Sequence, residues 1–132
     1  MKFTLSWLKE HIDLNTQEVN EIASCLTNIG LEVESVTDKS KELSSFTVAK
    51  VLEATKHPDA DRLKVCKVQT HQGNFQVVCG APNARSGMLG VFAPENSYIP
   101  GTKINLKKTK IRGVESSGML VSEREMGISD EH

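Results

Sequence analysis

From Phe46 onward, the chain is a series of short apolar runs separated by turn residues, and this pattern limits the folds open to it. Each run is four to nine residues long and rich in Val, Ile, Leu, Phe or Cys, as β-strands often are. No run in this part has the length and period of a long helix. The predicted strands are Phe46–Ala54, Leu63–Thr70, Phe75–Cys79, Met88–Ala93, Thr102–Leu106 and Gly118–Val121.

The second predicted strand changes face within its own length. Leu63 and Val65 point one way, whereas Cys66 and Val68 point the other. β-Bulges, or coverage of both faces, produce such a change, and both are common in small closed barrels. Five or six short strands in about ninety residues therefore favour a mostly β fold, a five-stranded Greek-key barrel of the OB type.

Residues 1–30 have a helical pattern instead. We expect a short helix capped by Ser6 and a longer one capped by Thr16, since both side chains can accept a bond from a free backbone N–H. The longer helix ends at Gly30, where a left-handed residue is favoured. The alternation over Leu31–Val36 predicts one exposed strand.

These patterns divide the chain into a small helix-strand segment, residues 1–38, and a barrel domain, residues 39–132. The polar run Thr37–Glu42 is expected to be a linker. Ser122–Glu125 has the form of a capping box, which predicts a short helix. The chain then stops without a last strand, so we expect the barrel domain to be truncated at its carboxyl-terminal end.

Positive charge is concentrated in the middle of the chain. Residues 1–43 have a formal net charge of −4, residues 44–121 of +6 and residues 122–132 of −3. A basic middle indicates a polyanion partner. The first fourteen residues lack the apolar run of a secretory signal, and the three cysteines have neither CxxC nor disulfide-framework spacing. We therefore expect reduced thiols and a cytoplasmic location, with no membrane contact.

The densest group of cations lies near the end of the predicted barrel. No acidic residue occurs between Asn96 and Val114. If Lys107–Lys110 form a hairpin tip, several ammonium groups crowd one end of the barrel, where they can contact phosphates without reading bases. A solvated loop is the alternative. The candidate RNA-binding residues are Arg62, Lys64, Arg85, Lys103, Lys107, Lys108, Lys110 and Arg112.

Other chemistry is less favoured. His57, Asp59 and Asp61 could ligate a metal, but a turn with Asx caps explains them better, so no metal is expected. No activated nucleophile is evident, so no catalytic residue is expected. Three of the four aromatic residues in the barrel lie in apolar strand patterns, which favours charge-based contact with folded RNA over base stacking. These aromatic residues are Phe46, Phe75, Phe92 and Tyr98, of which Tyr98 is the exception.

Three multi-residue motifs occur in order, and a capping-box run follows them. The motifs are His57–Leu63, Cys79–Arg85 and Ile111–Leu120, followed by Ser122–Glu125. In this order and spacing they resemble the tRNA-binding OB domain of the EMAP II type. Val121 departs from that family, which often has Cys at this position.

The resemblance extends to both ends of the chain, through Met1–Phe3, Ser6–Leu8, Gly30–Glu34 and Met126–Gly127. These groups are similar to the β-subunit family of bacterial phenylalanyl-tRNA synthetases. The resemblance implies that residues 1–38 are the first half of a split domain and that this fragment is a non-catalytic tRNA-binding module with no cofactor of its own.

For the whole enzyme, the resemblance implies an α2β2 tetramer that attaches phenylalanine to tRNA(Phe) with ATP and magnesium. The chemistry would belong to the α subunit, and the partners of this chain would be tRNA and that subunit. Two alternatives stay open. The barrel could be a structural or assembly module with little RNA contact, since a fold does not fix a function. It could also be a free-standing tRNA-binding protein.

Overall fold

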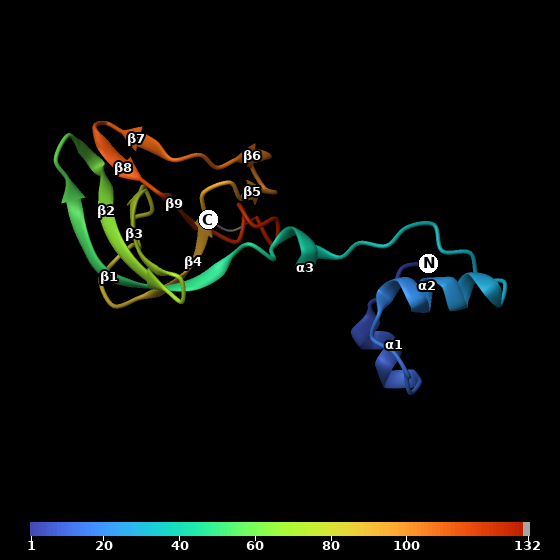
Figure 1. The fold of residues 1–132 in the computed structure, drawn as a ribbon. Helices are drawn as coiled ribbons and strands as arrows, with labels where there is room; N and C mark the ends of the chain where they lie inside the picture. The colour runs from blue at the N-terminus through green and yellow to red at the C-terminus, as the bar shows by residue number, and fades with distance from the viewer. Residues whose placement is uncertain (131–132) are drawn as a thin grey trace. The chain divides into compact units, whose positions relative to one another are not determined.

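The structure, a computed structural model, describes residues 1–130 of the chain. It divides into two compact units, with the boundary between Asp38 and Lys39. Figure 1 shows helices in the first unit and mainly strands in the second. Among the described residues, no helix combines the length and the apolar character that crossing a membrane requires.

The first unit contains α1 (Leu5–His11) and α2 (Val19–Asn28). Thr4, rather than Ser6, caps α1, because its extended backbone lets the Thr4 Oγ1 accept a bond from the backbone N–H of Trp7 at 3.2 Å. Thr16 accepts from the N–H of Glu18, but α2 begins only after Glu18, without a side-chain cap. Both helices are therefore present, with caps that differ from the expected ones.

Gly30 ends α2 as predicted. Its φ is +97°, and two bonds close the helix end in a Schellman motif, from Gly30 N to Thr27 O at 3.0 Å and from Leu31 N to Leu26 O at 2.9 Å. The strand predicted over Leu31–Val36 is wrong. A strand requires a hydrogen-bonded partner, and no strand in residues 1–130 pairs with this segment.

The second unit begins with a four-residue helix, α3 (Lys39–Glu42), inside the run that was expected to be a linker. The described residues after it, up to residue 130, form nine strands: β1 (Thr47–His57), β2 (Ala60–Thr70), β3 (Gly73–Cys79), β4 (Leu89–Pro94), β5 (Tyr98–Ile99), β6 (Ile104–Asn105), β7 (Thr109–Ile111), β8 (Val114–Ser116) and β9 (Gly118–Val121). The six predicted strands correspond to β1, β2, β3, β4, β6 and β9. The short strands β5, β7 and β8 were not predicted.

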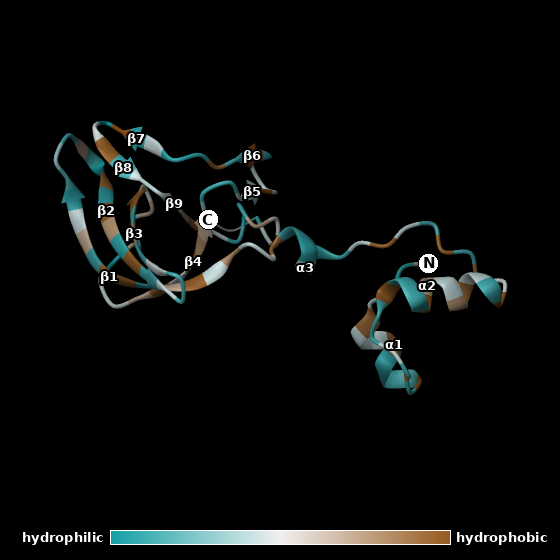
Figure 2. Ribbon diagram, in the orientation of Figure 1, coloured by the Kyte–Doolittle hydropathy of each residue, from teal (hydrophilic) through white to brown (hydrophobic). Residues whose placement is uncertain are grey.

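One antiparallel sheet forms most of the second unit. Its strand order is β3-β2-β1-β4-β9, and β5–β6 and β7–β8 form two separate hairpins. The sheet curls strongly in Figure 1 and surrounds a core that includes Ala49, Val51, Cys66, Val68 and Phe92. Brown and teal bands alternate along β1 and β2 in Figure 2, as expected for strands with one buried face.

The predicted change of face in the second strand is present. Cys66 and Val68 are buried, whereas Val65 is half-buried. The pairing of β1 with β2 shifts register between Val51 and Glu53, as a β-bulge does. The bulge bends β1 and helps the sheet to close on itself.

The sheet closes where β3 meets β8 and β9. Ser117 N donates to Gln76 O at 2.9 Å, and Val78 N donates to the Oγ of Ser116 at 3.0 Å. The Gln76 side chain donates to Glu115 O at 3.0 Å. These bonds complete a small barrel, which confirms the predicted OB-type fold.

The helix predicted from Ser122 is reduced to a single turn. Glu125 Oε2 accepts from the Ser122 N–H at 2.7 Å and from its hydroxyl at 2.9 Å, so the capping-box contact forms. Gly127 then adopts φ +67°, and Ile128 N donates to Glu123 O at 2.9 Å. The chain therefore leaves the helical path after one turn.

Candidate nucleic-acid interface

The β1–β2 turn is organised by a buried histidine. His57 is 2% exposed, its Nδ1 accepts a bond from the Asp59 N–H at 3.0 Å, and its Nε2 lies 3.0 Å from Ile111 O. Since Nδ1 accepts, Nε2 must carry the proton and donate. The buried His57 side chain therefore links the turn to the chain near residue 111. No group of three His, Cys, Asp or Glu residues within the described chain is placed to hold a metal ion.

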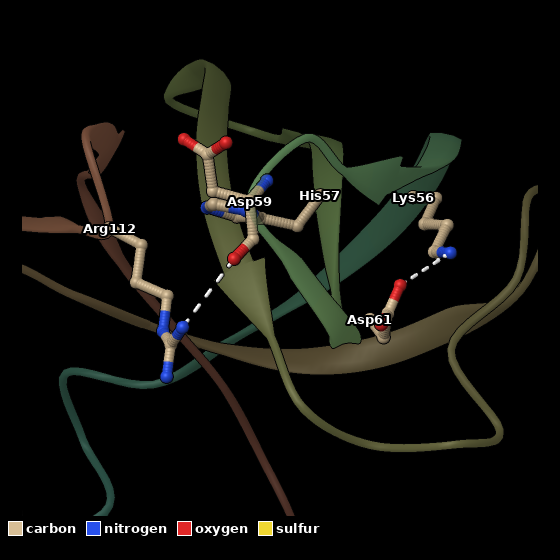
Figure 3. Close-up of polar contacts among 5 residues, drawn as sticks. All are labelled: Lys56, His57, Asp59, Asp61 and Arg112. Carbon is tan, nitrogen blue, oxygen red and sulfur yellow. Dashed lines mark hydrogen bonds and ion pairs between the residues drawn. The ribbon is translucent and has the colours of Figure 1, made fainter.

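The tip of the β7–β8 hairpin lies at Arg112 and Gly113, with φ +48° and +84°. In Figure 3, Arg112 reaches towards the β1–β2 turn, and its Nη1 donates to Asp59 O at 3.5 Å. The expected tip at Lys107–Lys110 is wrong. Two residues with positive φ make the tight turn at 112–113, so Lys107 and Lys108 precede β7 and Lys110 lies within it.

Five exposed cations lie along the segment from the β5–β6 turn to the β7–β8 tip. In Figure 1 this segment runs from β6 to β7 along one side of the second unit. Lys107 and Lys108 precede β7, Lys110 lies within it and Arg112 is at the hairpin tip, so the cations follow one another along the segment instead of sharing one tip. We call this set the basic strip; its members are Lys103, Lys107, Lys108, Lys110 and Arg112.

Acidic residues neutralise little of the basic strip. Within residues 1–130, its one ion pair joins the Lys108 Nζ to Glu115 Oε2 at 3.8 Å, between side chains that are both more than half exposed. Such surface pairs contribute about 0–1 kcal/mol. The ammonium and guanidinium groups of the basic strip therefore remain available to a polyanion.

Arg62 is exposed near the start of β2, shortly after the β1–β2 turn. Lys56, which the sequence reasoning did not select, is also exposed and pairs with Asp61 at 2.7 Å. Figure 3 shows this pair on the opposite side of the turn from Arg112. Lys56 is therefore engaged by Asp61 and lies away from the Arg112 end of the basic strip. Its position directly before His57 is the sequence signal that could have pointed to it as a charged residue of the turn.

Two candidate residues lie elsewhere and have local partners. The half-buried Lys64 donates from Nζ to Pro82 O at 3.0 Å and to Ala84 O at 2.6 Å. The exposed Arg85 donates to Asn83 O at 3.5 Å. Lys64 therefore holds the loop at residues 82–84, and its contact with RNA stays a prediction, as does that of Arg85.

The aromatic side chains of the barrel serve mainly to pack its core. Phe92 is 1% exposed and stacks on Phe75 with ring centroids 5.0 Å apart, while Phe46 is half-buried. Tyr98 is exposed, on the short strand β5. The strip therefore offers cations for phosphate contact, without a row of stacking rings.

Burial makes Cys66 a poor candidate for a nucleophile. Cys66 and Cys79 are both buried and free of disulfides. Burial raises the pKa of the Cys66 thiol, and the neighbouring Cys79 raises it further. The Cys66 thiol therefore stays protonated at neutral pH, in its unreactive form.

Comparisons with known proteins agree with this geometry. A protein-family profile described as "Putative tRNA binding domain" matches residues 46–132. The chain is similar to phenylalanine–tRNA ligase beta subunits, with 58% identity over 134 residues to that of Mesorhizobium japonicum and 55% over 132 residues to that of Ruegeria pomeroyi. Each alignment covers 100% of this chain and 16% of the relative, so the chain spans about a sixth of these curated relatives.

A solved structure of Naegleria gruberi RNA ligase with PPi has a similar fold. The match has a TM-score of 0.52 and 17% sequence identity, and it covers 61% of this chain and 28% of that chain. At this identity the likeness concerns the fold.

Proposed function

This chain belongs to the tRNA-binding-domain family, and from that premise we propose that its barrel is a non-catalytic tRNA-binding module of a phenylalanine–tRNA ligase β subunit. The observation that supports the proposal most directly is the basic strip. Its five cations are exposed, and no acidic residue lies between Asn96 and Val114. Within residues 1–130 the strip has one ion pair, the exposed contact of Lys108 with Glu115. Arg62 extends the cationic surface onto the β1–β2 turn.

The strip binds phosphates rather than bases. Ammonium and guanidinium groups spread along an extended segment can follow the backbone of a folded RNA, whereas sequence reading requires side chains that reach base edges. The module therefore adds affinity and orientation for tRNA, and the choice of tRNA is made elsewhere in the ligase.

The remaining parts of the proposal concern the whole ligase. It attaches phenylalanine to tRNA(Phe) with ATP and magnesium, in an α2β2 assembly whose α subunit carries the chemistry, and it works in the cytoplasm. The identity of 52–58% to ligase β subunits supports these parts, as do the free cysteines, which suit a reducing compartment. Residues 1–38 then form the first half of a domain completed elsewhere in the β subunit.

The dependence of affinity on salt tests the proposal. We expect labelled tRNA(Phe) to bind the chain with a log–log salt slope of about −0.7 to −0.9 for each phosphate neutralised. The variant K107Q/K108Q/K110Q removes three strip cations, so its slope should be shallower by about two to three. The control K2Q/K41Q/K50Q removes the same charge from exposed lysines outside the strip.

The control should keep the slope of the unmodified chain within about half a unit. Equal slopes for the two triple variants would show that net charge, and not the strip, carries the binding. No detectable binding at low salt would instead favour the assembly-module alternative.

A further inference from the structure

The β1–β2 turn and the β7–β8 tip are joined by a closed ring of hydrogen bonds. His57 Nε2 donates to Ile111 O, and His57 Nδ1 accepts from the Asp59 N–H, both at 3.0 Å. Asp59 O in turn accepts from Arg112 Nη1 at 3.5 Å. Because Ile111 and Arg112 are neighbours in the chain, the ring closes on itself.

The bonds of this ring differ in strength, and the difference identifies the residue that holds it. The Arg112 bond is long, and the Arg112 side chain is exposed, so this bond contributes little. The two His57 bonds are shorter and belong to a side chain that is 2% exposed. Loss of a partner inside a buried site is costly. His57, rather than Arg112 itself, therefore fixes the tip against the turn.

The backbone at the tip is in a left-handed conformation that is unfavourable for a residue with a side chain. Arg112 is a non-glycine residue with φ +48°, a region that side chains rarely adopt without outside support. Its guanidinium has five N–H donors, and one of them is used by Asp59 O. The bond from His57 to Ile111 O therefore holds the backbone from which the Arg112 side chain projects at the end of the basic strip.

We propose that His57 is a positioning residue for RNA binding: it holds Arg112 where the phosphate backbone meets the end of the basic strip. This inference rests on the proposed function. On this proposal His57 contributes to RNA affinity as well as to the packing of the barrel, because the contribution of Arg112 to tRNA affinity depends on the bond between His57 and Ile111 O.

Two substitutions separate the two bonds of the imidazole. Asn places a polar atom near the position of Nδ1, so H57N keeps an acceptor for the Asp59 N–H and loses the donor to Ile111 O. Gln reaches the position of Nε2, so H57Q keeps a donor to Ile111 O and loses the other bond. H57Q should preserve the position of Arg112, and H57N should not.

The test is a double-mutant cycle in the 132-residue chain, with labelled tRNA(Phe) at low salt. In the unmodified chain, R112Q should weaken binding about fivefold. In H57N, R112Q should weaken it less than about twofold, because Arg112 is already misplaced. In H57Q the effect should return to about fivefold. V77A controls for lost stability, since it opens a cavity in the core without touching the ring, and R112Q should keep its full effect there.

The outcomes separate this inference from the proposed function. An unchanged effect of R112Q in folded H57N would overturn the positioning role. If R112Q has no effect in the unmodified chain while K107Q/K108Q/K110Q weakens binding, the strip binds RNA without Arg112, and only this inference fails. If H57N does not fold, the effect of R112Q measured in H57Q is the test. A smaller effect of R112Q in H57Q than in the unmodified chain would overturn the inference.

Discussion

At the scale of single residues, Gly118 is a position where the barrel leaves no room for a side chain. It lies at the start of β9 with φ +141°, and an added Cβ would lie 2.5 Å from Phe92 Cε2 and 2.6 Å from Ala93 O. Phe92 belongs to the core, so it cannot move away without opening a void. The absence of a side chain at Gly118 is therefore a requirement for closing β9 onto β4.

We predict that Gly118→Ala lowers the free energy of unfolding by about 2–4 kcal/mol, from overpacking together with backbone strain. Gly73→Ala is the matched control, because Gly73 has a similar φ of +129° and nothing within 4 Å of an added Cβ. It should cost about 1 kcal/mol, from strain only. Urea unfolding curves measure both, and equal losses would contradict the steric account.

Single residues also show where sequence reasoning reaches its limit. The turn at His57 was predicted from Pro58 and the Asx residues, and the structure has a turn there. The partner of the imidazole could not be predicted, because Ile111 is 54 residues away in the sequence and only the closed barrel brings it near. Lys64 is a similar case, since a loop 18 and 20 residues further on satisfies its ammonium group.

At the scale of elements, β3 is an edge strand that β8 and β9 cover through side chains as well as backbone. Ser116 is 2% exposed; its Oγ accepts from Val78 N and donates to Gly118 O, both at 3.0 Å. This hydroxyl therefore substitutes for a missing ladder bond and keeps the edge from being open.

We predict that Ser116→Ala destabilises the chain by about 1–3 kcal/mol, because it leaves a buried N–H and a carbonyl without their partner. Hydrogen exchange at the Val78 amide should accelerate more than exchange at the central strand β1. Ser117→Ala should be nearly neutral, since Ser117 joins β3 through its backbone N–H. A Val78 amide that stays as protected as before would contradict this role for Ser116.

The elements that sequence could predict are those whose pattern reflects burial. β1 to β4 carry apolar residues that fill the core, and each was expected near its observed range. β7 and β8 were missed because Thr109–Ser116 is mostly polar and pairs only as a short hairpin. The prediction for Leu31–Val36 failed for the opposite reason: the segment alternates like a strand, yet no strand within residues 1–130 pairs with it. Strand formation depends on a neighbour, which local pattern does not reveal.

At the scale of the whole molecule, charge is divided between the two units. Residues 1–38 hold two Lys and seven acidic residues, a formal net charge of −5, whereas residues 39–132 hold fourteen Lys or Arg and ten acidic residues, a charge of +4. The division of charge favours RNA contact on the second unit and disfavours it on the first. On this account the tRNA-binding surface is the basic strip with the adjoining β1–β2 turn.

A titration of the ¹⁵N-labelled chain with tRNA(Phe), followed by amide chemical shifts at low salt, tests this surface most directly. We predict that the shifted or broadened amides cluster at residues 57–62 and 103–115, while residues 1–38 are unaffected. Perturbations centred on α1 and α2, or on the exposed apolar side chains Val48 and Leu89 of β1 and β4, would contradict the account.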